Sequence, residues 1–115
     1  MGTDCIFCRI VNKEIPATIV YEDDQIVAFG DINPKAPVHV LIIPRKHIPG
    51  VTEMKGDDRE VVAHIFASAK KIASSLKVQE SGFRLVVNSG PDAGQAVNHL
   101  HVHLFGGRQL SWPPG

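Results

Sequence analysis

Three histidines alternate with aliphatic residues near the carboxyl end of the chain. His99, His101 and His103 are separated by Leu100 and Val102. Successive side chains of a β-strand point to opposite faces, so this pattern predicts three imidazoles on one face, about 6.7 Å apart. Near neutral pH, histidine can act as a nucleophile, a proton donor or a metal ligand. The sequence therefore favours a chemical site over three solvent-facing residues of an antiparallel sheet.

A loop rich in glycine and small polar residues, from Asn88 to Ala96, precedes the histidines. Gly94 has no Cβ, so its main chain can approach a ligand closely, and exposed N–H groups in such loops bind phosphate oxygens. Most loops of this composition are only turns. Because this loop runs directly into the histidine segment, we expect it to hold a phosphate beside the imidazoles.

Two cysteines, Cys5 and Cys8, lie near the amino terminus. A disulfide between them would close too short a loop to stabilise the fold substantially. In a reducing compartment, this spacing is typical of two thiolate ligands to one metal ion or of a redox pair. Two small buried residues are the third interpretation, and the pair alone does not decide among them.

Length and composition bound the class of protein. The chain has 115 residues, of which 43% are hydrophobic and 21% charged, as expected for one globular domain over residues 1–115. Twelve basic and twelve acidic side chains cancel, so we expect no nucleic-acid partner. No apolar run is long enough to span a membrane, and residues 1–4 do not begin a signal peptide, so we expect a cytoplasmic protein.

The hydrophobic pattern predicts an α+β domain. Apolar residues recur at helical spacing from Val61 to Leu76, with Asp57 and Glu60 as a capping box and His64 on the solvent side. A short helical turn is expected over residues 5–11. Strand-like runs without regular β-α-β alternation favour a mainly antiparallel sheet. The five predicted strands are 19–21, 26–29, 39–43, 83–88 and 97–105.

The segment from Gln95 to Arg108, which reads Gln-Ala-Val-Asn-His-Leu-His-Val-His-Leu-Phe-Gly-Gly-Arg, resembles the signature of the histidine triad (HIT) superfamily, Hint branch. This resemblance implies a HIT-like fold with a five-stranded sheet, one long helix and one short helix. It also implies a homodimer with Trp112 near the partner's site, although this end could instead pack locally. The likeness extends through residues 13–17, 21–24, 31–34, 36–39, 44–48 and 112–115.

The resemblance further implies a phosphoramidase that binds AMP or GMP and hydrolyses the P–N bond of purine nucleoside 5′-phosphoramidates. His101 would attack the α-phosphorus as a neutral imidazole, forming a nucleotidyl-histidine intermediate that water resolves. The carbonyl of His99 and the side chain of His39 would orient or polarise His101. His103 and main-chain N–H groups near Gln95 would contact phosphate oxygens.

Other matching positions are implied nucleotide contacts. Asp31 matches the residue that binds the ribose hydroxyls, Ile32 an apolar wall for the base, and Asn88 a polar contact near the phosphate. Ala96 stands where Hint enzymes commonly have serine, so slower turnover or a different leaving-group preference is expected. The implied nucleotide-binding set is Asp31, Ile32, Asn88, Gly94, Gln95, Ala96, His101 and His103.

In relatives with the Cys-x-x-Cys pair, the zinc ligands that match are His47 and His99 together with Cys5 and Cys8. The resemblance thus implies a structural Zn²⁺ that fixes His99 and leaves His101 free for chemistry. Three alternatives stay open. These are a dinucleoside polyphosphate hydrolase with the same nucleophile, a low-turnover nucleotide-binding or scaffold protein, and a catalytic zinc site built from the three histidines.

Overall fold

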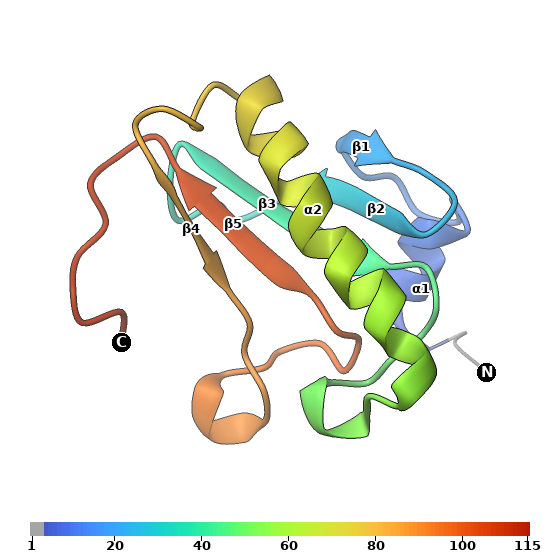
Figure 1. The fold of residues 1–115 in the computed structure, drawn as a ribbon. Helices are drawn as coiled ribbons and strands as arrows, with labels where there is room; N and C mark the ends of the chain where they lie inside the picture. Colours follow the sequence, from blue (N-terminus) through green and yellow to red (C-terminus); the bar gives the residue numbers. More distant parts are fainter. Residues whose placement is uncertain (1–3) are drawn as a thin grey trace.

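A computed structural model describes residues 4–115 of the chain (Figure 1). Its five strands form one antiparallel sheet in the order β1-β2-β3-β5-β4. The α+β prediction, with a five-stranded sheet, one long helix and one short helix, is confirmed. The elements are α1 (Ile6–Val11), β1 (Ile19–Glu22), β2 (Ile26–Gly30), β3 (Val38–Pro44), α2 (Arg59–Ser75), β4 (Phe83–Val86) and β5 (Val102–Gly106), with 3₁₀ turns at Val51–Glu53, Gly56–Asp58 and Pro91–Ala93.

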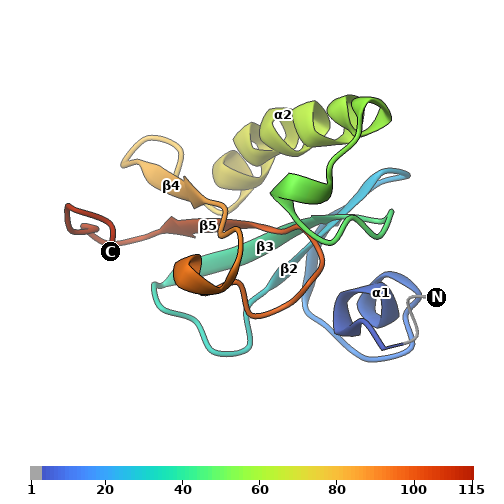
Figure 2. The same cartoon turned by 90° about the horizontal axis from the view of Figure 1, so that it is seen from below.

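Each face of the sheet has its own apolar core, with α2 over one face and α1 over the other (Figure 2). The residues that pack with α2 include alternate positions of the two central strands, Val40, Ile42, Val102 and Leu104. The opposite core contains Val27, Phe29, Leu41 and Ile43, together with Phe7 and Ile10 of α1. Burial on both faces accounts for the continuous apolar run of β3. Because α1 also covers the sheet, the face opposite α2 is not simply exposed to solvent.

The start of α2 differs from the predicted capping box. Asp58, at the end of the preceding 3₁₀ turn, is buried and accepts a hydrogen bond from the Lys55 N–H at 2.9 Å. Its other carboxylate oxygen lies 2.6 Å from Lys46 Nζ. α2 begins at Arg59 with Asp58 as its N-cap residue, so the prediction of an Asp57–Glu60 box is wrong. The Asp58 carboxylate caps the 3₁₀ turn through Lys55 and makes no side-chain capping hydrogen bond to α2 itself.

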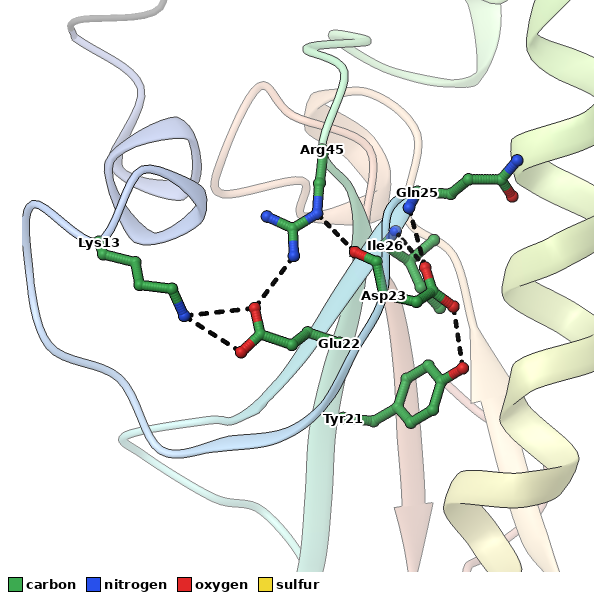
Figure 3. A network of polar contacts seen from close by, with 7 residues as sticks. All are labelled: Lys13, Tyr21, Glu22, Asp23, Gln25, Ile26 and Arg45. Atoms are coloured by element: carbon green, nitrogen blue, oxygen red, sulfur yellow. Dashed lines mark hydrogen bonds and ion pairs between the residues drawn. The ribbon is translucent and has the colours of Figure 1, made fainter.

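His64 has a specific partner and is only partly exposed. Its Nε2 lies 2.6 Å from Asp23 Oδ2, in the turn between β1 and β2. Asp23 also accepts hydrogen bonds from the Tyr21 hydroxyl and from the N–H groups of Gln25 and Ile26 (Figure 3). Burial acts to raise the pKa of Asp23, but these hydrogen bonds, the one from His64 foremost, hold it well below its usual range. The carboxylate therefore joins α2 to the β1–β2 turn.

We expect Asp23→Asn to lower the free energy of unfolding by about 1–3 kcal/mol at pH 7. A carboxylate whose pKa is depressed by folding contributes its stability above its unfolded pKa of about 3.9, and loses it as the pH falls toward the folded pKa. The difference between variant and wild type should therefore shrink by about 1 kcal/mol at pH 3. Urea denaturation at both pH values measures it. Equal differences at the two pH values would contradict the assigned role.

An exposed network connects the end of α1 to the chain that leaves β3 (Figure 3). Lys13 Nζ lies 3.1 Å from Glu22 Oε2, and Arg45 Nη2 lies 3.0 Å from Glu22 Oε1. Arg45 Nε also donates to the Asp23 carbonyl oxygen at 2.7 Å. The segments that carry the cysteines and His47 are thus both fastened to the β1–β2 hairpin.

Candidate functional site

The three histidines do not lie on one continuous strand. β5 begins at Val102, so His99 and His101 precede it and only His103 lies within it. The prediction of a strand over residues 97–105 is wrong in its first half. The physical reason is that this backbone bonds to the loop after β3, where the Leu100 N–H donates to the Ile48 carbonyl at 2.6 Å.

The histidines are also more buried than a solvated face would allow. His99 is fully buried and His101 is 6% exposed. The ring of Phe7, from α1, meets the His101 ring edge-on with centroids 5.2 Å apart. His101 and His103 are neighbours, with ring centroids 5.0 Å apart. The site is therefore a half-covered set of imidazoles between α1 and the sheet.

Main-chain groups decide which nitrogen of His101 carries its proton. Nδ1 lies 2.7 Å from the carbonyl oxygen of His99, which can only accept, so Nδ1 donates. Nε2 of the neutral ring then has a free lone pair. Within residues 4–115 Nε2 makes no hydrogen bond, and no buried side-chain nitrogen or oxygen there lacks a partner, so Nε2 is reached by solvent. An accessible, unprotonated imidazole nitrogen is suited to nucleophilic attack.

The same reasoning makes His103 a hydrogen-bond donor. The Lys35 N–H donates to His39 Nδ1 at 3.1 Å, so the proton of neutral His39 is on Nε2. His39 Nε2 lies 3.0 Å from His103 Nδ1, which must therefore accept and leave the His103 proton on Nε2. Arg108 holds this loop by donating to the Lys35 carbonyl at 2.8 Å. His39, expected to orient His101, thus contacts His103.

Burial lowers the pKa of His103 to about 4, with further lowering by His101 and His39. Burial also lowers the pKa of His39. The carboxylate of Asp31, whose Oδ2 lies 3.5 Å from His39 Nε2, acts in the opposite direction and raises it. Both rings are therefore neutral at physiological pH.

We expect the His103 ring resonances to stay constant from pH 7.5 to about 5.5, where an unperturbed histidine would already be largely protonated. Nuclear magnetic resonance titration of the ring protons measures this. A midpoint near pH 6.5 for His103 would show that the neutral hydrogen-bonded chain from Lys35 does not form in solution.

A second group of possible ligands comprises Cys5, Cys8, His47 and His99, whose donor atoms all lie within 4.8 Å of one another. His99 Nδ1 lies 3.3 Å from Cys5 Sγ and 3.6 Å from Cys8 Sγ. His47 Nδ1 lies 3.4 Å from Cys8 Sγ and 3.2 Å from His99 Nδ1. Around tetrahedral zinc, bonds of about 2.3 Å to sulfur and about 2.0–2.1 Å to nitrogen place ligand atoms about 3.3–3.8 Å apart. The four residues fit this ion.

The tautomer of His99 suits a metal ligand, and the two cysteines need a cation to become thiolates. His99 Nε2 donates to the Pro44 carbonyl at 2.8 Å, so Nδ1 presents its lone pair to the cysteines. Burial and the neighbouring Cys5 raise the pKa of the Cys8 thiol to about 11. Two adjacent thiolates are costly without a cation, and a divalent ion supplies the compensating charge.

Asp31, His39 and His103 also lie close enough to share an ion, but their hydrogen bonds argue against it. The Lys35 N–H keeps the proton of His39 on Nε2, the nitrogen that would have to bind the metal. The three triad histidines likewise do not converge. His99 Nδ1 faces the cysteines, whereas His103 faces His39, so this geometry does not favour a catalytic zinc held by all three.

The loop from Asn88 to Ala96 has fewer unpaired main-chain N–H groups than expected. The N–H groups of Gly94 and Gln95 donate to the carbonyls of Pro91 and Gly90. The Gln95 side chain accepts from the Gly90 N–H at 3.0 Å. Gly94 is needed for its left-handed backbone, with φ of 84°. Within residues 4–115 the Ala96 N–H makes no hydrogen bond, which leaves it as an available donor three residues before His99.

The remaining predicted nucleotide contacts are Asp31, Ile32 and Asn88. Asp31, Ile32 and His39 line a hollow of about 320 Å³ that does not include His101. Ile32 is fully exposed and available to a flat apolar group. Asn88 is half-buried just after β4.

Trp112 is 80% exposed, and the guanidinium of Arg84, on β4, lies over its ring at 5.9 Å from the centroid. No helix among residues 4–115 is long and apolar enough to cross a membrane.

Two contributors to the site escaped sequence reasoning. Phe7 reads as a core residue, and only its position between two cysteines marks it as close to a metal ligand. The N–H of Lys35 is invisible to any pattern of side chains, because its role depends on a loop conformation.

Known proteins are similar to this chain over nearly its full length. A crystal structure of a HIT family hydrolase from Legionella pneumophila superposes with a TM-score of 0.94 at 52% identity, covering 96% of this chain and 99% of that one. An uncharacterized HIT-like protein from Synechocystis is 50% identical over 115 residues, which is 100% of both chains. A 14 kDa zinc-binding protein from Brassica juncea is 48% identical, covering 97% of this chain and 100% of that one. The family model of the HIT domain matches residues 12–110, and the chain belongs to the HIT domain family.

Proposed function

We propose that the protein is a hydrolase of purine nucleoside 5′-phosphoramidates and works through a nucleotide bound covalently to His101. The observation that carries the proposal is the solvent-reached, unprotonated Nε2 of His101, fixed by a 2.7 Å hydrogen bond from Nδ1 to the His99 carbonyl. The description of the Legionella relative as a hydrolase supports the class of reaction.

The neighbouring groups suit both steps of this reaction. His101 Nε2 attacks the α-phosphorus, the P–N bond breaks, and the amine leaves with a proton from water. His103, with its proton on Nε2, donates to a non-bridging phosphate oxygen, and the Ala96 N–H is a second donor. The hydroxide left by that proton transfer then attacks the phosphorus of the adduct. The bond from phosphorus to Nε2 breaks, which releases the nucleoside monophosphate and returns the lone pair to His101.

The substrate contacts are assigned to the remaining residues of the set. Asp31 accepts from the ribose hydroxyls, Ile32 packs against the purine of AMP or GMP, and Asn88 contacts the phosphate end. Residues 1–115 act as one domain in this scheme, and a homodimer brings Trp112 to the site of the partner subunit. The exposed position of Trp112 leaves it free for such a contact.

We assign the group of Cys5, Cys8, His47 and His99 to a structural zinc ion. The fit of the four ligand atoms supports the assignment, as does the name of the Brassica juncea relative. Zinc at this position stabilises the junction of α1 with the loops and takes no part in bond breaking, because His101 supplies no ligand to the group.

Mass spectrometry of the protein, mixed with adenosine 5′-phosphoramidate, quenched in alkali and then digested, tests the proposal. We expect a mass increase of one AMP unit minus water on the peptide that contains His101, together with free AMP. His64→Ala should form the same adduct. Release of AMP without any adduct, at quench times shorter than one turnover, would contradict the covalent pathway.

Ala96 supports dinucleoside polyphosphate hydrolysis as a second candidate. Its methyl group offers no hydroxyl to a leaving amine, whereas a phosphate leaving group needs no such assistance. Comparing kcat/KM on adenosine 5′-phosphoramidate and diadenosine polyphosphate ranks the two activities. Nucleotide binding with no turnover of either substrate would favour a low-turnover binding or scaffold protein.

A further inference from the structure

His99 belongs to two sites at once. Its ring lies in the metal-ligand group, with Nδ1 3.3 Å from Cys5 Sγ and 3.2 Å from His47 Nδ1. Its main-chain carbonyl accepts the hydrogen bond from His101 Nδ1 at 2.7 Å. A displacement of His99 therefore also displaces the acceptor that fixes the His101 tautomer.

The helix that carries the cysteines supplies a second link. Phe7 is buried between Cys5 and Cys8, and its ring meets the His101 ring at 5.2 Å with an interplanar angle of 87°. It also meets the His99 ring at 5.9 Å. α1 has only six residues, and helices this short are unstable without tertiary anchors. The ligand cysteines are such anchors, one on each side of the aromatic ring that contacts His101.

The chain before β5 is likewise held in place by tertiary contacts. Two hydrogen bonds join it to the segment after β3, from Gln95 Nε2 to the Pro49 carbonyl and from the Leu100 N–H to the Ile48 carbonyl. A third runs from His99 Nε2 to the carbonyl of Pro44, the last residue of β3. The segment after β3 also carries His47. A metal bound by the four ligands would fasten α1, this segment and the histidine backbone at one point.

We propose that the group formed by Cys5, Cys8, His47 and His99 is a positioning device for the nucleophile. Zinc bound there holds the His99 carbonyl and the Phe7 ring in place, and so keeps His101 in the one tautomer that has a free Nε2. His99 and Phe7 act as positioning residues, through contacts with a ring that the metal does not touch. The inference rests on the function proposed for His101 and adds that metal loading sets its reactivity.

The tautomer of His101 can be observed without substrate. Long-range ¹H–¹⁵N correlation spectra of labelled protein distinguish a protonated from an unprotonated ring nitrogen. We expect one tautomer, protonated on Nδ1, when zinc is bound, and two exchanging tautomers after chelation. An unchanged His101 pattern in metal-free protein that keeps its circular dichroism spectrum would overturn the proposal.

Phe7→Leu separates the positioning of His101 from metal binding. It also tests the proposal if chelation unfolds the protein. This variant keeps all four ligands, so it should bind one zinc ion as wild type does. We expect mixed His101 tautomers and nucleotidylation of His101 at least about tenfold slower. Phe66→Leu, at an exposed position of α2, is the matched control and should behave as wild type. A wild-type tautomer and rate in Phe7→Leu would contradict the proposal.

Two outcomes distinguish the inference from the function on which it rests. A zinc-dependent tautomer without any nucleotidyl adduct would support the coupling and remove the proposed reaction. An adduct that forms equally fast with and without zinc, in folded protein, would support the reaction and overturn the coupling.

Discussion

Replacing His101 by glycine is expected to lower phosphoramidate turnover by about 10⁴-fold or more, because it removes the atom that forms the bond to phosphorus. The substrate pocket would remain, so KM should change far less than kcat. The core residues on either side, Leu100 and Val102, stay in place, so the fold should persist. Steady-state release of AMP from adenosine 5′-phosphoramidate measures the loss.

His64→Ala is the control for loss of a histidine, because His64 lies on α2 and contacts Asp23 rather than the triad. It should keep turnover within about twofold at a temperature well below its unfolding midpoint. If His101→Gly retains more than a hundredth of wild-type kcat, with no contaminating hydrolase, His101 is not the nucleophile. Water would then have to attack the phosphorus directly.

Removing zinc is expected to cost about 4 kcal/mol of stability, measured against protein with free zinc at roughly a thousand times its dissociation constant. The four ligands come from α1, the segment after β3 and the chain before β5, so the ion opposes separation of all three. Urea denaturation in a reducing buffer, with added zinc or with chelator, measures the difference. The apolar cores on both sheet faces should keep the metal-free protein folded.

Cys5→Ser provides the comparison for that experiment. Serine is a poor zinc ligand, so the stability of this variant should respond little to zinc or chelator. His39→Ala, in the other histidine group, should respond as wild type does, because Lys35 keeps that group unsuited to metal. If the zinc response persists in Cys5→Ser, the ion binds elsewhere.

The fold was largely predictable because its residues repeat a simple pattern. Val40, Ile42, Val102 and Leu104 alternate with positions that face the other core, and α2 carries an apolar stripe through Ile65, Ala69 and Ile72. Phe66 is an apolar residue of the same run from Val61 to Leu76, yet it is 48% exposed. Helical spacing places it near the edge of the stripe, where the pattern alone cannot decide burial.

The candidate site was predictable in its members but not in its connections. Cys5, Cys8, His47 and His99 were brought together by resemblance, since their separation of up to 94 positions gives no local signal. The partner of His39 was assigned to His101, whereas the antiparallel register of β3 and β5 pairs His39 with Phe105 and so places it diagonally across from His103, which it contacts. The early end of β5 depends on loop hydrogen bonds, which the alternating pattern does not encode.

Two peptide groups, the carbonyl of His99 and the N–H of Lys35, determine which ring nitrogens of the histidines carry protons. Peptide groups do not titrate in the physiological range, and no ordinary side-chain replacement removes them. Natural variation at position 35 can therefore alter the exposed side chain freely, proline excepted, while the imidazoles keep their roles. Changes in reactivity within such a protein should arise from shifts of loop backbone more readily than from exchange of surface charge.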